Sequence, residues 1–488
     1  MKTVQNEEIK SSTRTYSYLG HPEQEPWNGQ PPEGSVCSIE DYDYHIKYQC
    51  AFQVSLWAMP ATSIYKFRAS AFDDIGAKDN DILTWSGTAG PNLEGLTVNS
   101  STPYIAAYTD LQRGPVILEV PATGEDGSLY GQVVDAWQFT IADVGPSGVD
   151  KGKAAKYLFT PPGYDTTKIP DIDQYIHVPS PSYRIALAFR SIVVEGKTTE
   201  DAYNYAHRLR MYYLDDAGNP PEQKFIDPLE MRYASLIPYD EKQFEDIHAI
   251  FSVEPLRGKD KVMRGMLKVL GSERGKPFEP DETAIRAMRQ AAIDVWFYLQ
   301  NCFDTIPQED MYWPDRHYLS LMMTDARRKF EYEYRDRIDI IPRAMQFMWC
   351  TYVPEKLSHS PATQYLCAMA DNNGQLLKAG KTYKIDVPAD VPVEQFWALT
   401  VYDRATFAFI YVPNKRTTLS TYDLEQMEIN PDGSIPIIVG PKAPEGMEGN
   451  WIDTAGKRPM PMFRFYGPQE ALNDQKTFKM PDFELVEL

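Results

Sequence analysis

The spacing of apolar residues along this chain changes twice. Between residues 82 and 195, short β-branched runs alternate with Gly and Pro, which is typical of antiparallel strands. From Thr198 to about residue 345 the apolar residues recur at helical spacing, and from about residue 363 the strand pattern returns. Separate runs of strands and helices argue against alternating βα units. The sequence therefore predicts an α+β multidomain protein, with two mostly antiparallel β-domains, sandwich-like or jelly-roll-like, joined by an α-helical section.

The same changes divide the chain of 488 residues into four segments. We expect an irregular N-terminal arm, a first β-rich domain with leading helices, a helical section and a C-terminal β-domain. The predicted bounds are 1–37, 38–197, 198–362 and 363–488. Because proline cannot donate the helical hydrogen bond, the leading helical run is expected to break near Pro60.

Individual elements can be placed within these segments. Thr198 followed by Asp201 is a capping pair that predicts the start of a helix. Further helices are predicted at 260–269, 281–299 and 314–334, and a turn at Asn372-Asn373-Gly374. The best-marked strands are expected at 132–142, 183–194, 382–387, 395–402, 436–439 and 460–466.

The net charge of the chain limits the kinds of molecule that it is expected to bind. The chain has 49 Lys and Arg against 69 Asp and Glu, a net charge of −20, and no basic stripe offsets it. A surface this acidic repels phosphate backbones, so nucleic acid is not an expected partner. No window approaches 18 uninterrupted apolar residues, so no membrane span is expected.

The cysteines and the N-terminal residues indicate in which cellular compartment the protein is expected. The five cysteines form no CxxC pair, which fits a reducing environment better than a disulfide framework. The first residues, beginning Met1-Lys2-Thr3-Val4, lack the apolar stretch of a signal peptide. The sequence therefore predicts a cytoplasmic location.

The common catalytic and cofactor motifs are absent. The chain contains no GxGxxG, GxxxxGK[ST], HExxH or GxSxG, and its seven histidines form no HxH or HxxxH pair. The sequence therefore predicts no cofactor and no local metal site, and a metal site built from distant residues stays open. Whether the protein is an enzyme is left undecided.

Two charges lie on faces that are otherwise apolar in the predicted strands. Asp135 shares the face of Trp137 and Phe139, and Arg190 shares the face of Ala188. A buried charge needs a partner, so one interpretation is a structural Asp135–Arg190 pair. The other is the polar floor of a ligand cavity, with Asp135 as acid or base because a carboxyl group beside an indole has a raised pKa.

The C-terminal segment offers similar alternatives. Arg464 and Tyr466 share one strand face, and Tyr402 ends another strand that also carries Trp397 on its opposite face. These aromatic residues fit either core packing or an aromatic-walled pocket in which Arg464 anchors an anion. In the first case Arg464 would pair with Asp403 or Asp135 and brace the interface.

Several ordered motifs resemble a known pair of domains. Thr102-Pro103-Tyr104, Asp110-Leu111 and the run from Pro115 to Pro121 resemble the domain of unknown function 1254. The runs from Phe396 to Asp403 and from Phe463 to Pro468 resemble the domain of unknown function 1214. The resemblance implies two β-domains bridged by helices, and it brings no assigned reaction and no catalytic residues.

Three functions remain open. The first is an enzyme of unassigned reaction, acting by acid–base chemistry on a small, partly apolar and possibly anionic molecule in an aromatic-lined cavity. The second is a non-catalytic small-molecule binder, and the third is a structural or assembly protein; a homo-oligomer is compatible with each. The candidate catalytic residues are Asp135 and Tyr402, and the candidate ligand-binding residues are Tyr104, Trp137, Arg190, Trp397, Arg464 and Tyr466.

Overall fold

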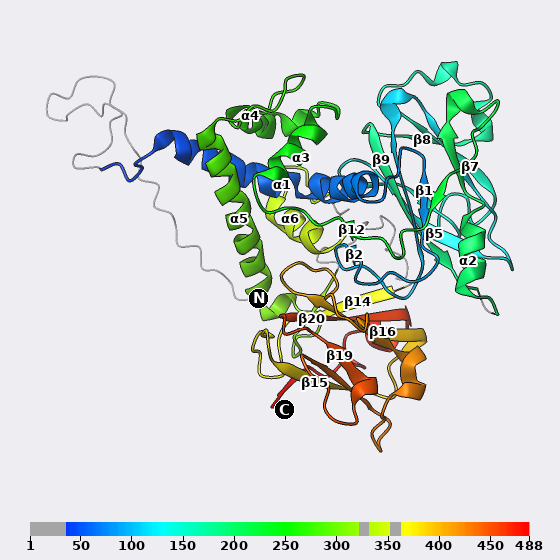
Figure 1. The fold of residues 1–488 in the computed structure, drawn as a ribbon, viewed down its shortest axis with the longest axis vertical. Helices are drawn as coiled ribbons and strands as arrows, with labels where there is room; N and C mark the ends of the chain where they lie inside the picture. Colours follow the sequence, from blue (N-terminus) through cyan, green and yellow to red (C-terminus); the bar gives the residue numbers. More distant parts are fainter. Residues whose placement is uncertain (1–35, 195, 322–330, 352–362, 488) are drawn as a thin grey trace. The chain divides into compact units, whose positions relative to one another are not determined.

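The computed structural model describes residues 36–194, 196–321, 331–351 and 363–487. The chain separates into two compact units, Met1–Tyr42 and Asp43–Leu488, and the second holds nearly all of the described residues. Most of the predicted N-terminal arm lies outside the described residues. The fold is a mixed α+β fold with several mostly antiparallel sheets and helices (Figure 1). No closed barrel or jelly roll is identified in the part of the chain that the structure describes.

Two sheets make up the first β-rich region. One has the strand order β11-β1-β3-β9-β5-β6 and the other the order β10-β4-β7-β8. They share a core of alternating residues such as Ile105, Leu118 and Leu187, because each strand turns every second side chain inward. The bounds are β1 Ile82–Thr84, β3 Tyr104–Asp110, β4 Val116–Val120, β5 Ser128–Val134, β6 Thr140–Val144, β7 Ala155–Thr160, β8 Ile176–Pro179, β9 Arg184–Ile192, β10 Arg210–Tyr213 and β11 Phe225–Ile226. A short parallel pair joins β2 Leu93–Glu94 to β12 Tyr233–Ala234.

Two further sheets form the C-terminal region. One has the order β13-β14-β20-β16-β17 and the other the order β19-β18-β15-β21. Their facing sides bury residues such as Leu399, Ile437 and Phe463. The bounds are β13 Tyr318–Ser320, β14 Thr363–Ala368, β15 Thr382–Val387, β16 Val393–Asp403, β17 Thr418–Ser420, β18 Ile435–Gly440, β19 Trp451–Asp453, β20 Pro459–Pro468 and β21 Glu484–Val486.

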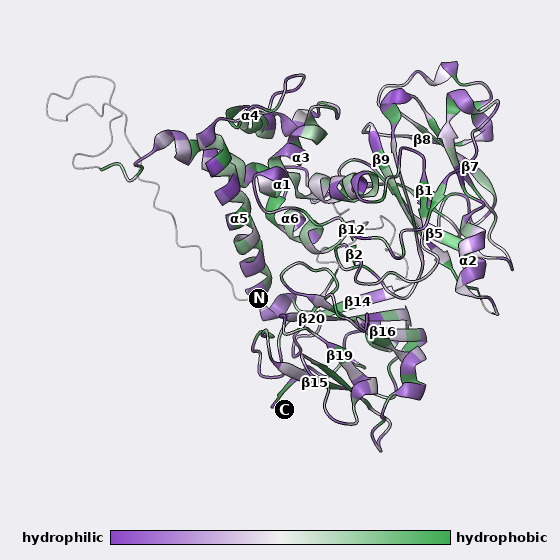
Figure 2. Cartoon of the chain, viewed as in Figure 1, coloured by the Kyte–Doolittle hydropathy of each residue, from purple (hydrophilic) through white to green (hydrophobic). Residues whose placement is uncertain are grey.

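The helices lie mainly between these regions in the sequence. Their bounds are α1 Tyr42–Asp73, α2 Thr199–Ala206, α3 Lys242–Phe251, α4 Lys261–Val269, α5 Glu282–Asp304, α6 Ile340–Trp349 and α7 Glu470–Asn473. Figure 2 shows polar and apolar residues alternating along α5, as expected for a helix with one buried stripe. None of the helices in the described ranges is long and apolar enough to cross a membrane.

Most predicted elements are confirmed. The side chain of Thr198 caps α2 and Asp201 completes the capping box, as expected. The helices at 260–269 and 281–299 correspond to α4 and α5, and β15 has the predicted bounds 382–387. The turn at Asn372-Asn373-Gly374 is also present, because Gly374 adopts a φ of 70° that favours glycine.

Three element predictions are wrong. Helix α1 continues through Pro60, because the buried residues on both sides of the proline hold the helix in place. The predicted strand 132–142 is instead a hairpin, with Asp135 and Phe139 at the turn between β5 and β6. The predicted helix 314–334 contains β13, and its residues 322–330 lie outside the described residues.

Candidate functional site

One row of polar side chains crosses the sheet of the first β-rich region. The register pairs Arg190 of β9 with Tyr104 of β3 on one side and with Tyr130 of β5 on the other. Directly opposed residues in adjacent strands present their side chains on the same face. The guanidinium carbon of Arg190 lies 4.8 Å from the centre of the Tyr104 ring, and Nη1 donates to Thr102 Oγ1 at 2.8 Å. Arg190 and both tyrosines are half-buried.

A matching row crosses the five-stranded C-terminal sheet. The register pairs Arg464 of β20 with Tyr365 of β14 and with Ala398 of β16. Arg464 is only 1% exposed, and its guanidinium carbon lies 5.1 Å from the centre of the Tyr365 ring. The opposite face of the same strands carries Phe463, Leu399 and other core residues. The alternation of β20 thus places a cation on the face that points away from the C-terminal core.

Arg464 bridges to the first β-rich region. Nη2 donates to the carbonyl oxygen of Thr97 at 2.9 Å and also to the hydroxyl oxygen of Tyr402, while Nη1 donates to Thr400 Oγ1 at 2.9 Å. Nε is buried without a partner in the described residues. The prediction that Arg464 reaches the first region is confirmed. The alternative pairing with Asp403 is wrong, because Asp403 forms an ion pair with Lys457 at 2.8 Å.

The acceptor residue Thr97 has an unusual backbone. Its φ is 42°, a left-handed conformation that a β-branched residue rarely adopts. The backbone N–H of Thr97 donates to Phe407 O at 2.7 Å, and its hydroxyl donates to Trp349 O at 2.7 Å. These bonds, together with the one from Arg464, stabilise a conformation that otherwise costs free energy. The carbonyl group is thereby fixed toward the guanidinium.

The two arginines have no carboxylate partner among the described residues. No ion pair involves Arg190 or Arg464 in those ranges. Instead, both guanidinium groups act electrostatically on Tyr365. Burial raises the pKa of Tyr365, but the nearby charges of Arg190 and Arg464 outweigh burial and hold the pKa below its usual value. We call Arg190, Arg464, Tyr104, Tyr365 and Tyr466 the arginine–tyrosine cluster.

Hydrogen bonds to Tyr466 also join the two regions. The hydroxyl oxygen of Tyr466 accepts from Asn99 Nδ2 at 2.7 Å and lies 2.6 Å from Ser101 Oγ. The backbone N–H of Asn99 donates to the hydroxyl oxygen of Tyr104 at 2.8 Å. The loop at 99–101 therefore holds one tyrosine from each region, so the cluster is built from both.

Tyr402 lies in the same place but its hydroxyl group is already engaged. It donates to the carbonyl oxygen of Val98 and accepts from Arg464 Nη2. Burial raises the pKa of this phenol, with Arg464 opposing the change. A hydroxyl proton committed to a buried carbonyl is poorly placed for transfer, so Tyr402 has the geometry of a positioning residue.

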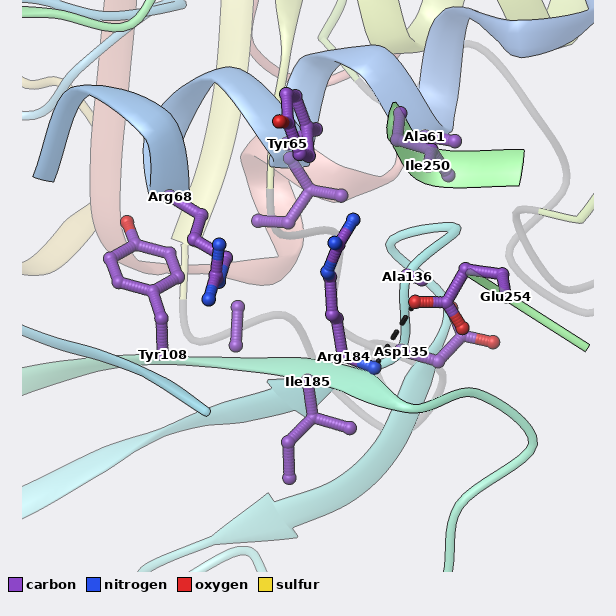
Figure 3. Close-up of a pocket in the computed structure, with 12 residues that line it drawn as sticks. Ala61, Tyr65, Arg68, Tyr108, Asp135, Ala136, Arg184, Ile185, Ile250 and Glu254 are labelled. Atoms are coloured by element: carbon purple, nitrogen blue, oxygen red, sulfur yellow. Dashed lines mark hydrogen bonds between the residues drawn. The ribbon is translucent and has the colours of Figure 1, made fainter. Parts of the chain in front are cut away.

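Asp135 lies in a different place, at a small pocket beside α1 and α3 (Figure 3). Its carboxylate accepts from the backbone N–H groups of Trp137 at 2.8 Å and Phe139 at 2.9 Å. The predicted Asp135–Arg190 pair is therefore wrong: the hairpin satisfies the carboxylate locally. The pocket also contains Glu254, and its volume of about 20 Å³ is room for a single water molecule.

Burial dominates the titration of both carboxyl groups in this pocket. Burial raises the pKa of Asp135 to about 6 although two backbone N–H groups oppose the change. Burial likewise raises the pKa of Glu254 to about 7, opposed by the backbone N–H of Tyr183 and by Arg184. Groups of this kind can exchange protons near neutrality, but this pocket has no space for a substrate.

The two candidate tryptophans do not join the cluster. Trp137 packs with its ring centre 5.0 Å from that of Trp57, and the guanidinium carbon of Arg257 lies 3.8 Å from the Trp137 ring centre. Trp397 is 3% exposed in the C-terminal core beside Phe463. The structure thus brings together Tyr104, Arg190, Tyr402, Arg464 and Tyr466, and places Asp135, Trp137 and Trp397 elsewhere.

Sequence reasoning missed several residues of the cluster. Tyr365 lies in the short strand Thr363–Ala368, in which two polar residues are followed by Tyr365 and three smaller apolar residues, so no alternation marks its face. Asn99 and Ser101 precede the Thr102-Pro103-Tyr104 motif outside any strand, so no alternation indicates a role for their side chains. In the described ranges no group of three or more His, Cys, Asp and Glu side chains is placed to hold a metal ion.

A groove of about 470 Å³ lies next to the cluster. Ser101, which contacts Tyr466, and Ala398, the strand neighbour of Arg464, are among its lining residues. Further lining residues come from β17 and from the 3₁₀ helix Thr421–Gln426. The volume falls within the range of small-molecule sites.

Comparisons with known proteins place the two regions in described families. A family model described as "Protein of unknown function (DUF1254)" matches residues 80–213, and one described as "Protein of unknown function (DUF1214)" matches residues 362–470. No match was found among curated proteins.

Two solved structures are similar. The VPA0106 protein from Vibrio parahaemolyticus is 16% identical, with a TM-score of 0.50, and the match covers 90% of this chain and 100% of that chain. A putative uncharacterized protein from Burkholderia cenocepacia is 12% identical, with a TM-score of 0.38, covering 91% of this chain and 96% of that chain. The first likeness concerns the fold alone.

Proposed function

We propose that this protein, in which a DUF1254 domain is followed by a DUF1214 domain, binds a small, partly apolar anion at the arginine–tyrosine cluster. We further propose that it acts on this molecule as an enzyme, by acid–base chemistry. The proposal keeps the domain division 1–37, 38–197, 198–362 and 363–488, with sandwich-like β-domains that each supply one wall of the site.

One observation carries the binding proposal. Two arginines from different sheets influence the same tyrosine, and neither has a carboxylate partner among the described residues. Positive charges brought together in a low-polarity setting are costly unless an anion offsets them. A carboxylate ligand would supply that charge, and the rings of Tyr104 and Tyr365 would contact its apolar part.

The catalytic part rests on Tyr365. A phenol is a weak acid, and a pKa held below its usual value by two cations brings proton transfer closer to neutral pH. Tyr402 would then orient Arg464 through their shared hydrogen bond. Asp135 remains a proposed proton carrier, but only through water, because its pocket has room for no larger molecule.

Binding can be tested by thermal shift with benzoate and phenylacetate as probes. We expect both carboxylates to stabilise the wild type and Arg190→Met to lose this stabilisation while keeping its fold. Arg208→Met is the matched control, since this arginine is 51% exposed and pairs with Asp126 at the surface. If neither carboxylate stabilises the wild type, the anion site is excluded.

The second candidate function, a non-catalytic binder, uses the same cluster. The variant Tyr365→Phe separates the two, because it removes the titrating hydroxyl and keeps the ring. For an enzyme, Tyr365→Phe should retain benzoate binding and abolish turnover of any substrate found by screening. Retention of both binding and turnover would remove Tyr365 from the mechanism.

A further inference from the structure

The groove beside the cluster differs from it in charge. Its four charged side chains comprise two cations and two anions, namely Lys415, Arg416, Glu230 and Asp423. Lys415 forms an ion pair with Glu230 at 3.1 Å, and the carboxylate of Asp423 accepts from the backbone N–H of Ser420 at 2.8 Å. The groove therefore presents no net charge, and an ion would gain little by entering it.

Hydroxyl groups dominate the remaining polar surface of the groove. Seven of the lining residues carry a hydroxyl group: Thr88, Ser100, Ser101, Thr417, Thr418, Ser420 and Tyr422. A hydroxyl group both donates and accepts hydrogen bonds, so such a wall complements a ligand that is itself rich in hydroxyl groups. A ligand that carries only hydrogen-bond acceptors, or only donors, would use only one of the two kinds of hydrogen bond that these hydroxyl groups can form.

Some of these polar groups are already connected to the cluster. Ser100 Oγ lies 2.6 Å from Thr418 Oγ1, which donates to Thr400 Oγ1 at 3.0 Å, and Thr400 accepts from Arg464. These hydrogen bonds connect the groove to Arg464 and restrict the side chains of Ser100 and Thr418. The side chains of three other lining residues, Thr88, Asn92 and Tyr422, make no hydrogen bond within the described residues, so their polar atoms are available to a ligand.

One aromatic side chain, Tyr422, is among the residues that line the groove. Tyr422 is 75% exposed, and its ring centre lies 4.8 Å from that of Phe396. Phe396 in turn stacks on Tyr466 with ring centres 4.0 Å apart. The inner rings hold Tyr422 in place, while its outer surface faces solvent. A rigid, exposed ring beside hydroxyl groups can pack on the C–H face of a sugar ring.

From this combination of neutral charge, hydroxyl walls and a supported tyrosine, we infer that the groove binds a neutral saccharide. The inference goes beyond the proposed anion site and does not rest on it, because neither Arg190 nor Arg464 lines the groove. The volume of about 470 Å³ accommodates a mono- or disaccharide. The ligand would pack one ring on Tyr422 and form hydrogen bonds with Thr88 and Asn92.

The inference can be tested by saturation-transfer NMR and calorimetry with glucose, maltose and sucrose as probes. We expect at least one of the three to bind saturably, and Tyr422→Ala to weaken that binding about tenfold. Tyr411→Ala is the matched control, because Tyr411 is 69% exposed but does not line the groove. Gluconate, a charged relative of glucose, should bind more weakly than glucose.

Three outcomes would overturn the inference. They are the absence of saturable binding by all three sugars, equal losses in Tyr422→Ala and Tyr411→Ala, and tighter binding of gluconate than of glucose. Thr88→Val provides a second variant that keeps the shape of the side chain while removing a hydroxyl group, and it should also weaken binding. Benzoate stabilisation without sugar binding would leave the anion site in place and exclude only the saccharide.

Discussion

Arg464 and Asp135 are both almost fully buried charges, yet their surroundings differ in kind. Asp135 is satisfied by two backbone N–H groups of its own hairpin, within four residues of chain. Arg464 reaches acceptors more than 300 residues away, at Thr97 and Val98, in addition to Tyr402 and Thr400 in its own sheet. A charge satisfied locally stabilises a turn, whereas a charge satisfied across two regions makes each of them depend on the other.

The largest expected effect concerns Arg464. The variant Arg464→Met leaves the carbonyl oxygens of Thr97 and Val98 and the hydroxyl group of Tyr402 without their donor. We expect a loss of about 3–5 kcal/mol in the free energy of unfolding, measured by urea denaturation. The surface variant Arg208→Met should lose about 1 kcal/mol or less. Equal losses in the two variants would show that Arg464 does not couple the regions.

A second prediction uses the raised pKa of Asp135. Because its pKa is about 6 in the folded state and near 3.8 when exposed, the folded protein holds the proton more tightly between these values. The contribution of Asp135 to the free energy of unfolding must therefore fall as pH rises from about 4 to about 6. The variant Asp135→Asn, which keeps a hydrogen-bond acceptor for the turn, should be more stable than the wild type at pH 7 by up to about 3 kcal/mol.

Measurements at low pH provide a control for the prediction about Asp135→Asn. Well below pH 4 the wild-type carboxyl group is protonated in both the folded and the unfolded state, so the advantage of Asp135→Asn should disappear there. Urea denaturation at several pH values measures both limits. An Asp135→Asn variant that is less stable than the wild type at pH 7 would contradict the burial of an ionisable carboxyl group at this position.

A third prediction concerns the cations around Tyr365. Because Arg190 and Arg464 hold the pKa of Tyr365 below its usual value, Arg190→Met should raise it. The titration can be followed by tyrosinate absorbance, taking the difference between each protein and its Tyr365→Phe derivative. The substitution Arg208→Met should leave the difference titration unchanged. If Arg190→Met leaves the pKa of Tyr365 unchanged, the charge of Arg190 in the first β-rich region does not influence Tyr365 in the C-terminal sheet.

The smallest expected effect is at Tyr104. The variant Tyr104→Phe keeps the ring beneath the guanidinium group of Arg190 and removes only the acceptor for the Asn99 N–H. We expect a loss of about 1 kcal/mol in the free energy of unfolding. A much larger loss would mean that the hydroxyl group, and not the ring, holds this part of the cluster together.

The sequence predicted strand faces better than it predicted turns. The alternation along 183–194 and 460–466 placed Arg190 on one face with Ala188 and Arg464 on one face with Tyr466, and the strand registers agree with both. The same alternation failed at 132–142, because Trp137 and Phe139 continue the apolar pattern while packing against helices from within a turn. Alternation of apolar and polar residues therefore indicates which residues are buried, but it does not show whether they lie in one strand or in the turn of a hairpin.

The alternation of residues along the sequence did not predict which distant groups bind Asp135 and Arg464. The pairing of Asp135 with Arg190 was expected because both lie in one sheet region, but a turn can satisfy a carboxylate with backbone groups that leave no mark in the sequence. Arg464 was expected to reach the first region, and it does so through carbonyl oxygens rather than through an acidic side chain. Side-chain composition alone cannot distinguish these two solutions.

The bond from Arg464 to the carbonyl group of Thr97 has an evolutionary consequence. Every amino acid has the same carbonyl group, so residue 97 can change in a lineage without removing the acceptor, provided that the backbone keeps its left-handed φ. Glycine or asparagine adopts that conformation more readily than threonine does. Correlated substitutions between positions 97 and 464 would thus be absent from an alignment, and the signature of this contact would be an unvarying arginine opposite a loop of unvarying length.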